Sequence, residues 1–292
     1  VLPVLTLSEL AAAPVPRPPA PINAMPMVSL MLAWTRGSAT PARAETAAIL
    51  PDGLMAAYIA RDGFTGAQRI LEGAQGMAAG MSSDADPAKL IDGLGTRWGL
   101  AETSFKFHAS CRHTHPAADA LLKVMQDNKL KHDDITAVTA HVHQGAIDVL
   151  GPVTDPQTIH QSKFSMGFVL ALAALHGRAG LADFTEAALK DKDTRAFHDK
   201  VKMVLDPVVD GAYPRRWLGH VSATTKDGRR LEGKVSSPKG DPDNTLSRPE
   251  IEDKAVRLAG YNGGAGESEM GRVIQRVWRL RDEASVRDFL TV

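Results

Sequence analysis

The residues best suited to chemistry lie in one short segment, Lys106–Pro116, with the sequence KFHASCRHTHP. Five of its side chains are cationic or can become so: Lys106, His108, Arg112, His113 and His115. Proline is favoured in the first turn of a helix, so Pro116 predicts that a helix begins here. Helix N-termini favour negative charge, and an arginine presents a planar pair of donors to a carboxylate. We therefore expect this segment to bind an anion with two or three carboxylates.

Two other interpretations of this segment stay open. Its cations can be surface charges around a helix start, satisfied by water and nearby acids. Alternatively, Cys111, His113 and His115 share one face if residues 103–115 are extended, and their types suit zinc. Zinc ligands spaced only two apart on one strand are uncommon, and no Cys-x-x-Cys or His-Glu-x-x-His motif accompanies them, so we expect no metal site. His141 and His143, on one face of another predicted strand, are interpreted as structural.

Composition narrows the class of protein. The 292 residues include 34 basic and 34 acidic side chains, so no overall field attracts nucleic acid or an anionic membrane. A single cysteine excludes an internal disulfide and fits a reducing compartment. No apolar run approaches the roughly 18 residues of a membrane span, and no basic leader precedes an apolar stretch. We expect a cytoplasmic protein without nucleic-acid or membrane partners, whose start at Val1 suggests a processed or trimmed chain.

The N-terminal third of the chain contains two different sequence patterns. Residues 11–21 (AAAPVPRPPAP) alternate alanine and proline, which disfavours both helix and sheet. From residue 54 the apolar spacing becomes helical, and short helices are predicted over 54–59, 70–73 and 88–94.

Beyond residue 102 the pattern mixes helices and strands. The spacing of apolar residues predicts a helix from Pro116 and a buried helix over 164–175. Asp227-Gly228 is a strong hairpin signal, and Ser247 with Glu250 forms a capping box at a helix start. The predicted strands cover 135–143, 201–205, 218–225 and 229–235; further helices are predicted over 181–190, 193–200, 247–259 and 270–280.

The stretch Ser110–Ala120 resembles the motif that opens the smaller domain of MmgE/PrpD proteins, the 2-methylcitrate dehydratase family. Further strings typical of that family follow in the expected order: GLMAA at 53–57, GFTG at 63–66, ILEG at 70–73, KFSM at 163–166, Tyr213-Pro214, KDG at 226–228, and PKGDP at 238–242 with Leu246-Ser247. Each string is weak alone, but together they make a specific match over about residues 51–292.

The resemblance implies an α+β fold. Its parts would be a portion of an all-helical domain and a smaller α/β lid domain with an antiparallel hairpin, with the active site between them, in a homodimer. We expect an irregular or altered segment at 1–50 and part of the helical domain at 51–100. The smaller domain would cover 101–245, and the helices of 246–292 would return to the helical domain.

The resemblance also implies an enzyme that needs no cofactor and acts on a small polycarboxylate. The leading expectation is a hydro-lyase of the 2-methylcitrate dehydratase type, which removes a proton next to a carboxylate of a small tricarboxylate. An epimerase or isomerase of a dicarboxylate such as iminodisuccinate is the second. An inactive truncated fragment that only binds a carboxylate ligand or a partner chain is the third.

The family motif, placed on this sequence, suggests roles for single residues. Lys106 and His113 would transfer protons. Ser110, Cys111, Arg112 and His115 would bind the substrate. The decarboxylase branch of the family carries a histidine where this chain has Cys111 and a tyrosine near the place of Phe168, which argues against decarboxylation. The family's N-terminal part supplies an Asp and a His, and its Lys/His loop is replaced here by residues 34–43, so we expect those groups to be missing.

Overall fold

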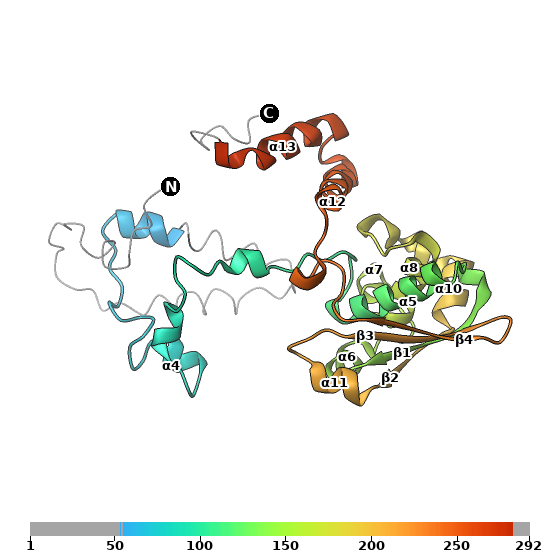
Figure 1. Ribbon diagram of the computed structural model, residues 1–292. Coiled ribbons are helices and arrows are strands. Elements are labelled where there is room, and N and C mark those ends of the chain that lie inside the picture. The colour runs from blue at the N-terminus through green and yellow to red at the C-terminus, as the bar shows by residue number, and fades with distance from the viewer. Residues whose placement is uncertain (1–52, 54, 283–292) are drawn as a thin grey trace. The chain divides into compact units, whose positions relative to one another are not determined.

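The computed structural model describes residue 53 and residues 55–282 (Figure 1). The chain divides into two compact units, Val1–Trp98 and Gly99–Val292, and each is described by itself. The expectation of an irregular segment at 1–50 lies outside the described residues.

The first unit contains short helical pieces joined by turns. A helix over residues 55–61 confirms the prediction there, and α4 spans Met77–Met81. The prediction of a helix over 70–73 is wrong, because these residues belong to a run of turns and bends that contains Gly73 and Gly76. The helix predicted over 88–94 is reduced to a 3-10 turn at Pro87–Leu90, because Gly93 and Gly95 take left-handed backbone angles that break a helix.

A four-stranded mixed sheet is the centre of the second unit, in the order β2-β1-β3-β4. Its strands are β1 (Ile135–Val142), β2 (Val201–Leu205), β3 (Gly219–Thr225) and β4 (Arg230–Val235). β1 pairs parallel with β2 and antiparallel with β3, and the β3–β4 hairpin turns at Asp227-Gly228 with Gly228 at φ 83°. The predicted strands, the hairpin and the α+β class are confirmed.

Helices cover one face of this sheet (Figure 1). α5 (His115–Asp127) packs on β3 and β4, while α8 (Met166–His176) packs on α5, β2 and α10 (Lys192–His198). Inward-pointing Val138 and Ala140 alternate with outward residues along β1, as expected for a sheet with one face in the core. α8 is buried along almost its whole length, which confirms the buried helix predicted from its apolar run.

Shorter helices link these elements. They are α6 (Gln144–Leu150), α7 (Ile159–Ser162), α9 (Glu186–Lys190) and α11 (Pro207–Ala212). The capping box predicted at Ser247 and Glu250 starts α12 (Arg248–Gly260), and α13 (Glu267–Trp278) follows it. Among the helices that the structure describes, none has the length and apolar character needed to cross a bilayer.

Candidate functional site

The segment before α5 is not a strand. Residues 103–111 have no regular secondary structure, and Arg112–Thr114 form a 3-10 turn closed by the Thr114 N–H and hydroxyl, which both donate to the Cys111 carbonyl. The expectation of an extended chain over 103–115 is therefore wrong. The alternation that would place Cys111, His113 and His115 on one face is lost with it.

Backbone bonds to three separate loops hold this segment against the sheet unit. Phe105 N–H donates to Gly240 O, Ala109 N–H to Ala179 O, and Cys111 N–H to Lys163 O, each at 2.8 Å. Because the acceptors come from distant parts of the chain, only the folded unit can give the segment its shape.

His108 anchors the segment from inside. Its ring is fully buried; Nδ1 accepts from Ala179 N–H at 3.1 Å, so the proton of the neutral ring lies on Nε2 and is donated to Asp119 Oδ1 at 3.0 Å. The other oxygen of Asp119 accepts from Lys239 N–H at 2.6 Å. With both ring nitrogens satisfied, His108 joins α5 to two loops.

His115 and Ser110 also point into the interior. His115 is fully buried with its ring edge-on to His108 at 5.2 Å, and neither ring nitrogen makes a well-aligned hydrogen bond within the described part of the chain. Burial does most to lower the pKa of His115 to about 2, and the nearby positive charge of Arg112 acts in the same direction. Ser110 Oγ is paired with Thr114 Oγ1 at 2.8 Å.

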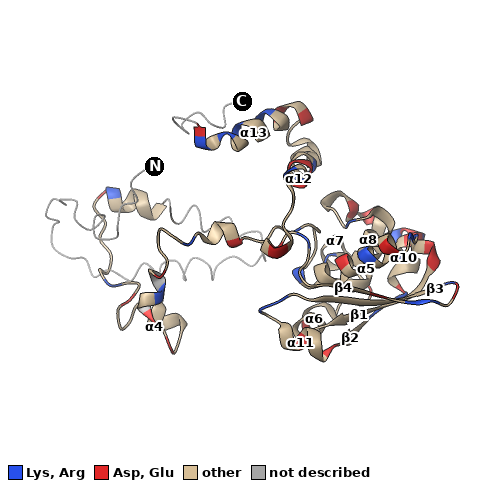
Figure 2. Cartoon of the chain, in the orientation of Figure 1, with Lys and Arg blue, Asp and Glu red and all other residues tan. Residues whose placement is uncertain are grey.

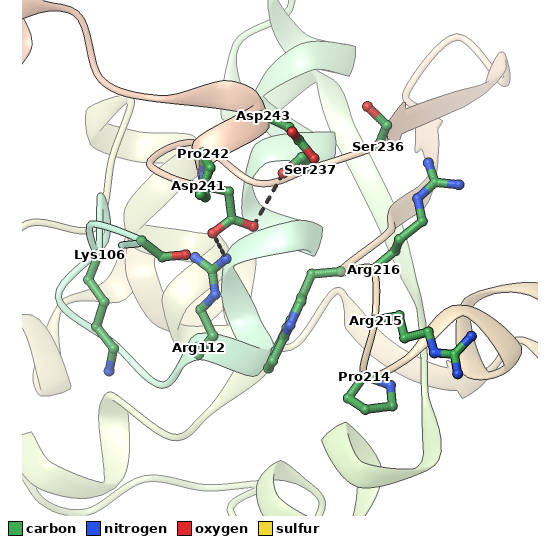
Figure 3. A pocket seen from close by; sticks show the side chains of 12 residues that line it. Lys106, Arg112, Pro214, Arg215, Arg216, Ser236, Ser237, Asp241, Pro242 and Asp243 are labelled. Carbon is green, nitrogen blue, oxygen red and sulfur yellow. Dashed lines mark hydrogen bonds and ion pairs between the residues drawn. The ribbon is translucent and has the colours of Figure 1, made fainter. Parts of the chain in front are cut away.

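A depression of about 550 Å³ opens beside this segment (Figure 3). Lys106 and Arg112 line one side, and the loop 214–217 that leads into β3 lines the other. Both of these stretches contain basic residues, which Figure 2 colours blue along the chain. Its charged lining residues are the cations Lys106, Arg112, Arg215 and Arg216 and the acids Asp241 and Asp243. Of the six residues singled out from the sequence, Lys106 and Arg112 line the depression.

Arg215 and Arg216 were missed by the sequence reasoning. The Tyr213-Pro214 string was noted for its resemblance, yet the arginine pair that follows it was not. Two consecutive arginines at the end of a loop are an available signal, but only the fold brings them opposite Lys106 and Arg112.

Arg112 is held in one orientation. Its guanidinium makes an ion pair with Asp241, which also accepts from Ser237 Oγ at 3.2 Å, and it lies over the Trp217 ring at 5.3 Å (Figure 3). Nη1 has no hydrogen-bond partner within the described residues. This unsatisfied Nη1 is buried, and Asp241 neutralises part of the guanidinium charge.

Lys106 folds back over its own segment. Its Nζ donates to the Ser110 carbonyl at 3.2 Å, and its own carbonyl accepts from Lys254 Nζ of α12 at 2.7 Å. Within the described residues one hydrogen bond holds the ammonium group, and Figure 3 shows the Lys106 side chain directed away from Arg215 and Arg216.

His113 pairs with His143 rather than with its neighbours in sequence. His113 Nδ1 lies 3.1 Å from His143 Nε2, and the cluster is completed by Tyr213, stacked on His143 at 3.8 Å, and by Trp217, 5.3 Å from His113. Burial lowers the pKa of both imidazoles, so both are neutral at pH 7.

The hydrogen bonds of this pair determine its tautomers. His143 Nδ1 accepts from Ala146 N–H at 3.3 Å, which places the His143 proton on Nε2, from where it is donated to His113 Nδ1. A neutral His113 then carries its own proton on Nε2. His143 is the N-cap of α6 and lies one residue beyond the end of β1. The expectation that His141 and His143 share one face of a strand is therefore wrong.

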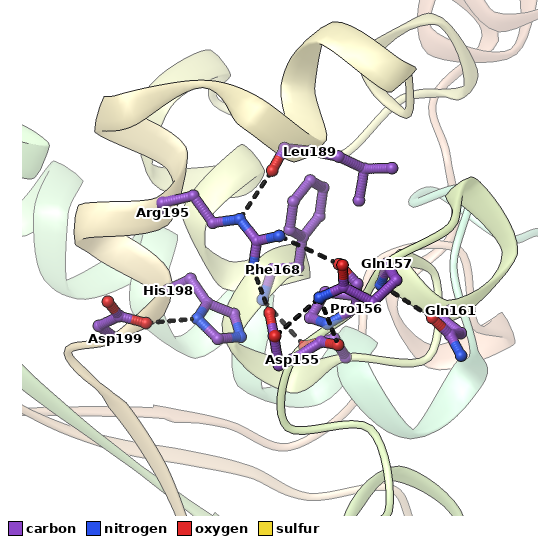
Figure 4. Close-up of polar contacts among 10 residues, drawn as sticks. Asp155, Pro156, Gln157, Gln161, Phe168, Leu189, Arg195, His198 and Asp199 are labelled. Carbon is purple, nitrogen blue, oxygen red and sulfur yellow. Dashed lines mark hydrogen bonds and ion pairs between the residues drawn. The ribbon is translucent and has the colours of Figure 1, made fainter.

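Arg195 makes a group of polar contacts that indirectly supports the segment before α5 (Figure 4). Arg195 donates to Leu189 O at 2.7 Å and Pro156 O at 3.2 Å and pairs with Asp155 at 2.6 Å. This holds the loop that enters α7, and α7 leads to Lys163, whose carbonyl receives the Cys111 N–H.

Cys111 and Phe168 differ in their surroundings. The Cys111 thiol is free and half-buried, and it packs against the core. Phe168 is fully buried within α8, 6.3 Å from the Phe184 ring, so its side chain belongs to the core rather than to the depression.

Comparison with known proteins places the chain by its sequence. The family model of the MmgE/PrpD C-terminal domain matches residues 108–280. Among curated proteins, the chain is similar to the cis-aconitate decarboxylase-like protein oryM of Aspergillus oryzae, with 24% identity over 266 residues that cover 86% of this chain and 54% of the relative. The chain thus spans about half the length of the curated relative it matches.

Proposed function

The chain belongs to the MmgE/PrpD family, and from that premise we propose that it acts on a small tricarboxylate as a hydro-lyase of the 2-methylcitrate dehydratase type. One observation supports this most: Lys106, Arg112, Arg215 and Arg216 line a single depression, and the lining residue Trp217 contacts His113 of the His113–His143 pair. Four cations against two acids suit a ligand with several carboxylates.

Dehydration of such an acid requires positive charges that stabilise the negatively charged intermediate. Removing a proton next to a carboxylate creates a second negative charge on the same group, and fixed positive charges lower that barrier. Arg112 is held by Asp241 and Trp217 before any ligand arrives, so little reorganisation is needed. Arg215 and Arg216 line the other side of the depression, and we propose that one of their long side chains turns inward to bind a second carboxylate.

The proton next to the carboxylate needs a base, and His113 suits this role because burial lowers its pKa and keeps the imidazole neutral at pH 7. For this step the pair takes the other tautomer, in which His113 holds its own proton on Nδ1, shared with His143, so that the Nε2 lone pair takes up the substrate proton. We assign the opposite transfer to Lys106, whose ammonium can give a proton to the leaving hydroxyl.

The other three residues of the segment receive different roles in this proposal. Ser110 and His115 are buried, so they shape the turn that presents Arg112 rather than touch a carboxylate. Cys111 stays a proposed substrate neighbour through its half-buried thiol. We also propose a homodimer, which light scattering of the purified chain would measure.

A second candidate is a chain that binds a tricarboxylate without turning it over, because this chain covers 54% of the relative it matches. A turnover assay with 2-methylcitrate, citrate, cis-aconitate and iminodisuccinate, run beside calorimetric titration with citrate, separates these candidates. Water loss from 2-methylcitrate supports the hydro-lyase, and turnover of iminodisuccinate alone supports an epimerase. Citrate binding with no turnover supports the second candidate.

Two variants test the assigned residues. Arg112→Ala should weaken citrate binding by roughly 1.5–3 kcal/mol, the scale of a hydrogen bond to a charged group. Lys106→Met should lower turnover far more than binding. Arg229→Ala is the matched control, since Arg229 is exposed on the β3–β4 turn and pairs with Asp227. Equal citrate affinity in Arg112→Ala and in the control would refute the carboxylate site.

A further inference from the structure

The outward face of the sheet carries a second polar cluster. On the face turned away from α5 and α8, His141 of β1 lies directly opposite His220 of β3, and Ser222 of β3 lies opposite Glu232 of β4. Cross-strand neighbours on one face are close enough for their side chains to interact. Three adjacent strands therefore contribute to one cluster, although its members are up to 91 residues apart in sequence.

The two imidazoles are oriented alike. Their rings stack at 4.0 Å with 13° between the planes. Asp206 Oδ2 lies 3.1 Å from His220 Nδ1 and 3.7 Å from His141 Nδ1, so both Nδ1 atoms face the same carboxylate. Both Nε2 atoms consequently face the other side of the cluster.

The two Nε2 atoms lie close to side-chain oxygens of Ser222 and Glu232. His220 Nε2 lies 2.7 Å from Glu232 Oε2, and His141 Nε2 lies 2.7 Å from Ser222 Oγ. The Ser222 hydroxyl in turn lies 3.0 Å from Glu232 Oε2. One ligand atom from each of His141, His220 and Glu232 falls within 4.8 Å of the other two.

Asp206 is itself fixed. It is the N-cap of α11, where its Oδ1 accepts from Val208 N–H at 2.8 Å and Val209 N–H at 3.2 Å. That leaves Oδ2 for the histidines. A carboxylate that accepts the Nδ1–H of a histidine fixes the tautomer in which Nε2 is free to bind a metal.

We propose that His141 Nε2, His220 Nε2 and the Glu232 carboxylate bind a Zn²⁺ ion, with a fourth position open to water. Two histidines and one glutamate are a ligand set that zinc uses when one position stays open. Asp206 supplies the supporting carboxylate, and Ser222 is placed to hydrogen-bond the Glu232 ligand. Because the two rings are nearly parallel, binding requires them to turn so that both Nε2 lone pairs converge on the ion.

This site is independent of the proposed function. None of its three ligands lines the depression that contains Lys106 and Arg112. Their side chains are reachable from solvent, with 20%, 19% and 46% of the side-chain surface of His141, His220 and Glu232 exposed. Within the described part of the chain, no other group of histidine, cysteine and acidic side chains meets the same ligand spacing.

The test is a metal titration of the tag-free chain of 292 residues. Zn²⁺ binding is measured by calorimetry, and Co²⁺ binding by the visible absorption of a tetrahedral cobalt site. We expect one ion per chain. His141→Ala and His220→Ala should each weaken binding by about tenfold or more, and Asp206→Asn by about tenfold.

Controls distinguish this cluster from other histidines. His132→Ala and His160→Ala, at histidines outside the cluster, should bind as the unchanged chain does. If His220→Ala unfolds by circular dichroism, Glu232→Gln decides, because it keeps an acceptor oxygen and removes only the charge; it should also weaken binding. Absence of saturable binding, unchanged affinity in the cluster variants, or loss of binding in His113→Ala instead would overturn the proposal.

Discussion

At the scale of single residues, the two buried histidines of the candidate site differ in what satisfies them. His108 has a partner for each ring nitrogen, whereas His115 has no well-aligned partner within the described residues and is surrounded by His108, Arg112 and the interior. A buried polar group without such bonds destabilises the fold, and a charged one does so far more. In the folded chain His115 is therefore present as the neutral imidazole.

This predicts how stability depends on pH. The pKa of His115 is about 2 in the folded chain against 6.5 for an ordinary histidine, so between these values the unfolded chain binds a proton that the folded chain does not. The free energy of unfolding should consequently fall as pH is lowered below about 6.5, with His115 contributing about 1.4 kcal/mol per pH unit. Urea unfolding from pH 7.5 to 4.5 measures this.

The variant His115→Phe isolates that contribution because it keeps a ring and removes the titration. Below pH 6 its unfolding free energy should decrease less steeply than that of the unchanged chain. Above pH 7 the two slopes should coincide, since the imidazole is neutral in both states there. Parallel slopes at all pH values would show that His115 can take up a proton inside the fold.

At the scale of elements, α5 lies unusually close to the sheet because two glycines face it. A Cβ on Gly219 would come within 2.1 Å of Pro116 O, and one on Gly233 within 2.3 Å of Ala120 O. The first turns of α5 therefore rest directly on β3 and β4. α5 begins at His115, directly after the turn that contains Arg112 and His113. The close contact with the sheet therefore also determines the position of these two residues.

Gly233→Ala should accordingly destabilise the second unit. The added methyl group meets backbone and the Val124 side chain, and overpacking of this kind costs roughly 1–3 kcal/mol. Gly211→Ala in α11 is the matched control, since nothing lies within 4 Å of its added Cβ. Chemical denaturation of both variants measures the difference. Equal stability would mean that α5 can shift away from the sheet.

The start of α12 depends on its capping box. Glu250 accepts from the Ser247 N–H and hydroxyl at 2.7 Å and pairs with Lys239 at 3.0 Å, and the first-named bond does most to lower the pKa of Glu250 to about 2. No residue of α12 is buried, so capping matters more there than packing.

Glu250→Ala should therefore speed hydrogen exchange over residues 248–260, by an amount equivalent to about 0.5–2 kcal/mol. Glu252→Ala, which removes the exposed ion pair with Arg248 and a hydrogen bond with Trp278, should change exchange by less. Mass-spectrometric exchange of the two variants makes the comparison. A larger effect in Glu252→Ala would contradict a role for the cap.

At the scale of the whole molecule, the buried apolar residues of the described chain all belong to the second unit. They run from Ala117 to Leu246, and the core cluster joins α5, α8 and the sheet. Large apolar side chains of the first unit such as Trp98, Met81 and Leu94 are exposed by contrast.

A fragment of residues 99–292 should therefore fold by itself. It contains the core, the sheet, the depression and the proposed zinc ligands, and a unit with its own core is expected to unfold cooperatively. Denaturant unfolding followed by circular dichroism and by tryptophan fluorescence should give one coincident transition. A broad, non-cooperative change would show that the core needs residues before 99.

Much of the local structure could be predicted because it depends on neighbours in sequence. The strands from alternation, the hairpin from Asp227-Gly228, the α12 cap from Ser247 and Glu250, and the buried α8 from its apolar run were all predicted correctly. The family was identified for the same reason, since its motifs are contiguous strings. The helix predicted over 70–73 failed where glycines outweighed the apolar spacing.

The sequence by itself thus determined the α+β class, the family and the segment in which Lys106 and Arg112 lie. Only the tertiary structure decided which side chains share a site. It buried His115, joined His113 to His143, placed Arg215 and Arg216 opposite Arg112, and brought His141 to His220. The physical reason is that local signals extend over a few residues, whereas these contacts depend on strand register and on loops anchored by distant carbonyls.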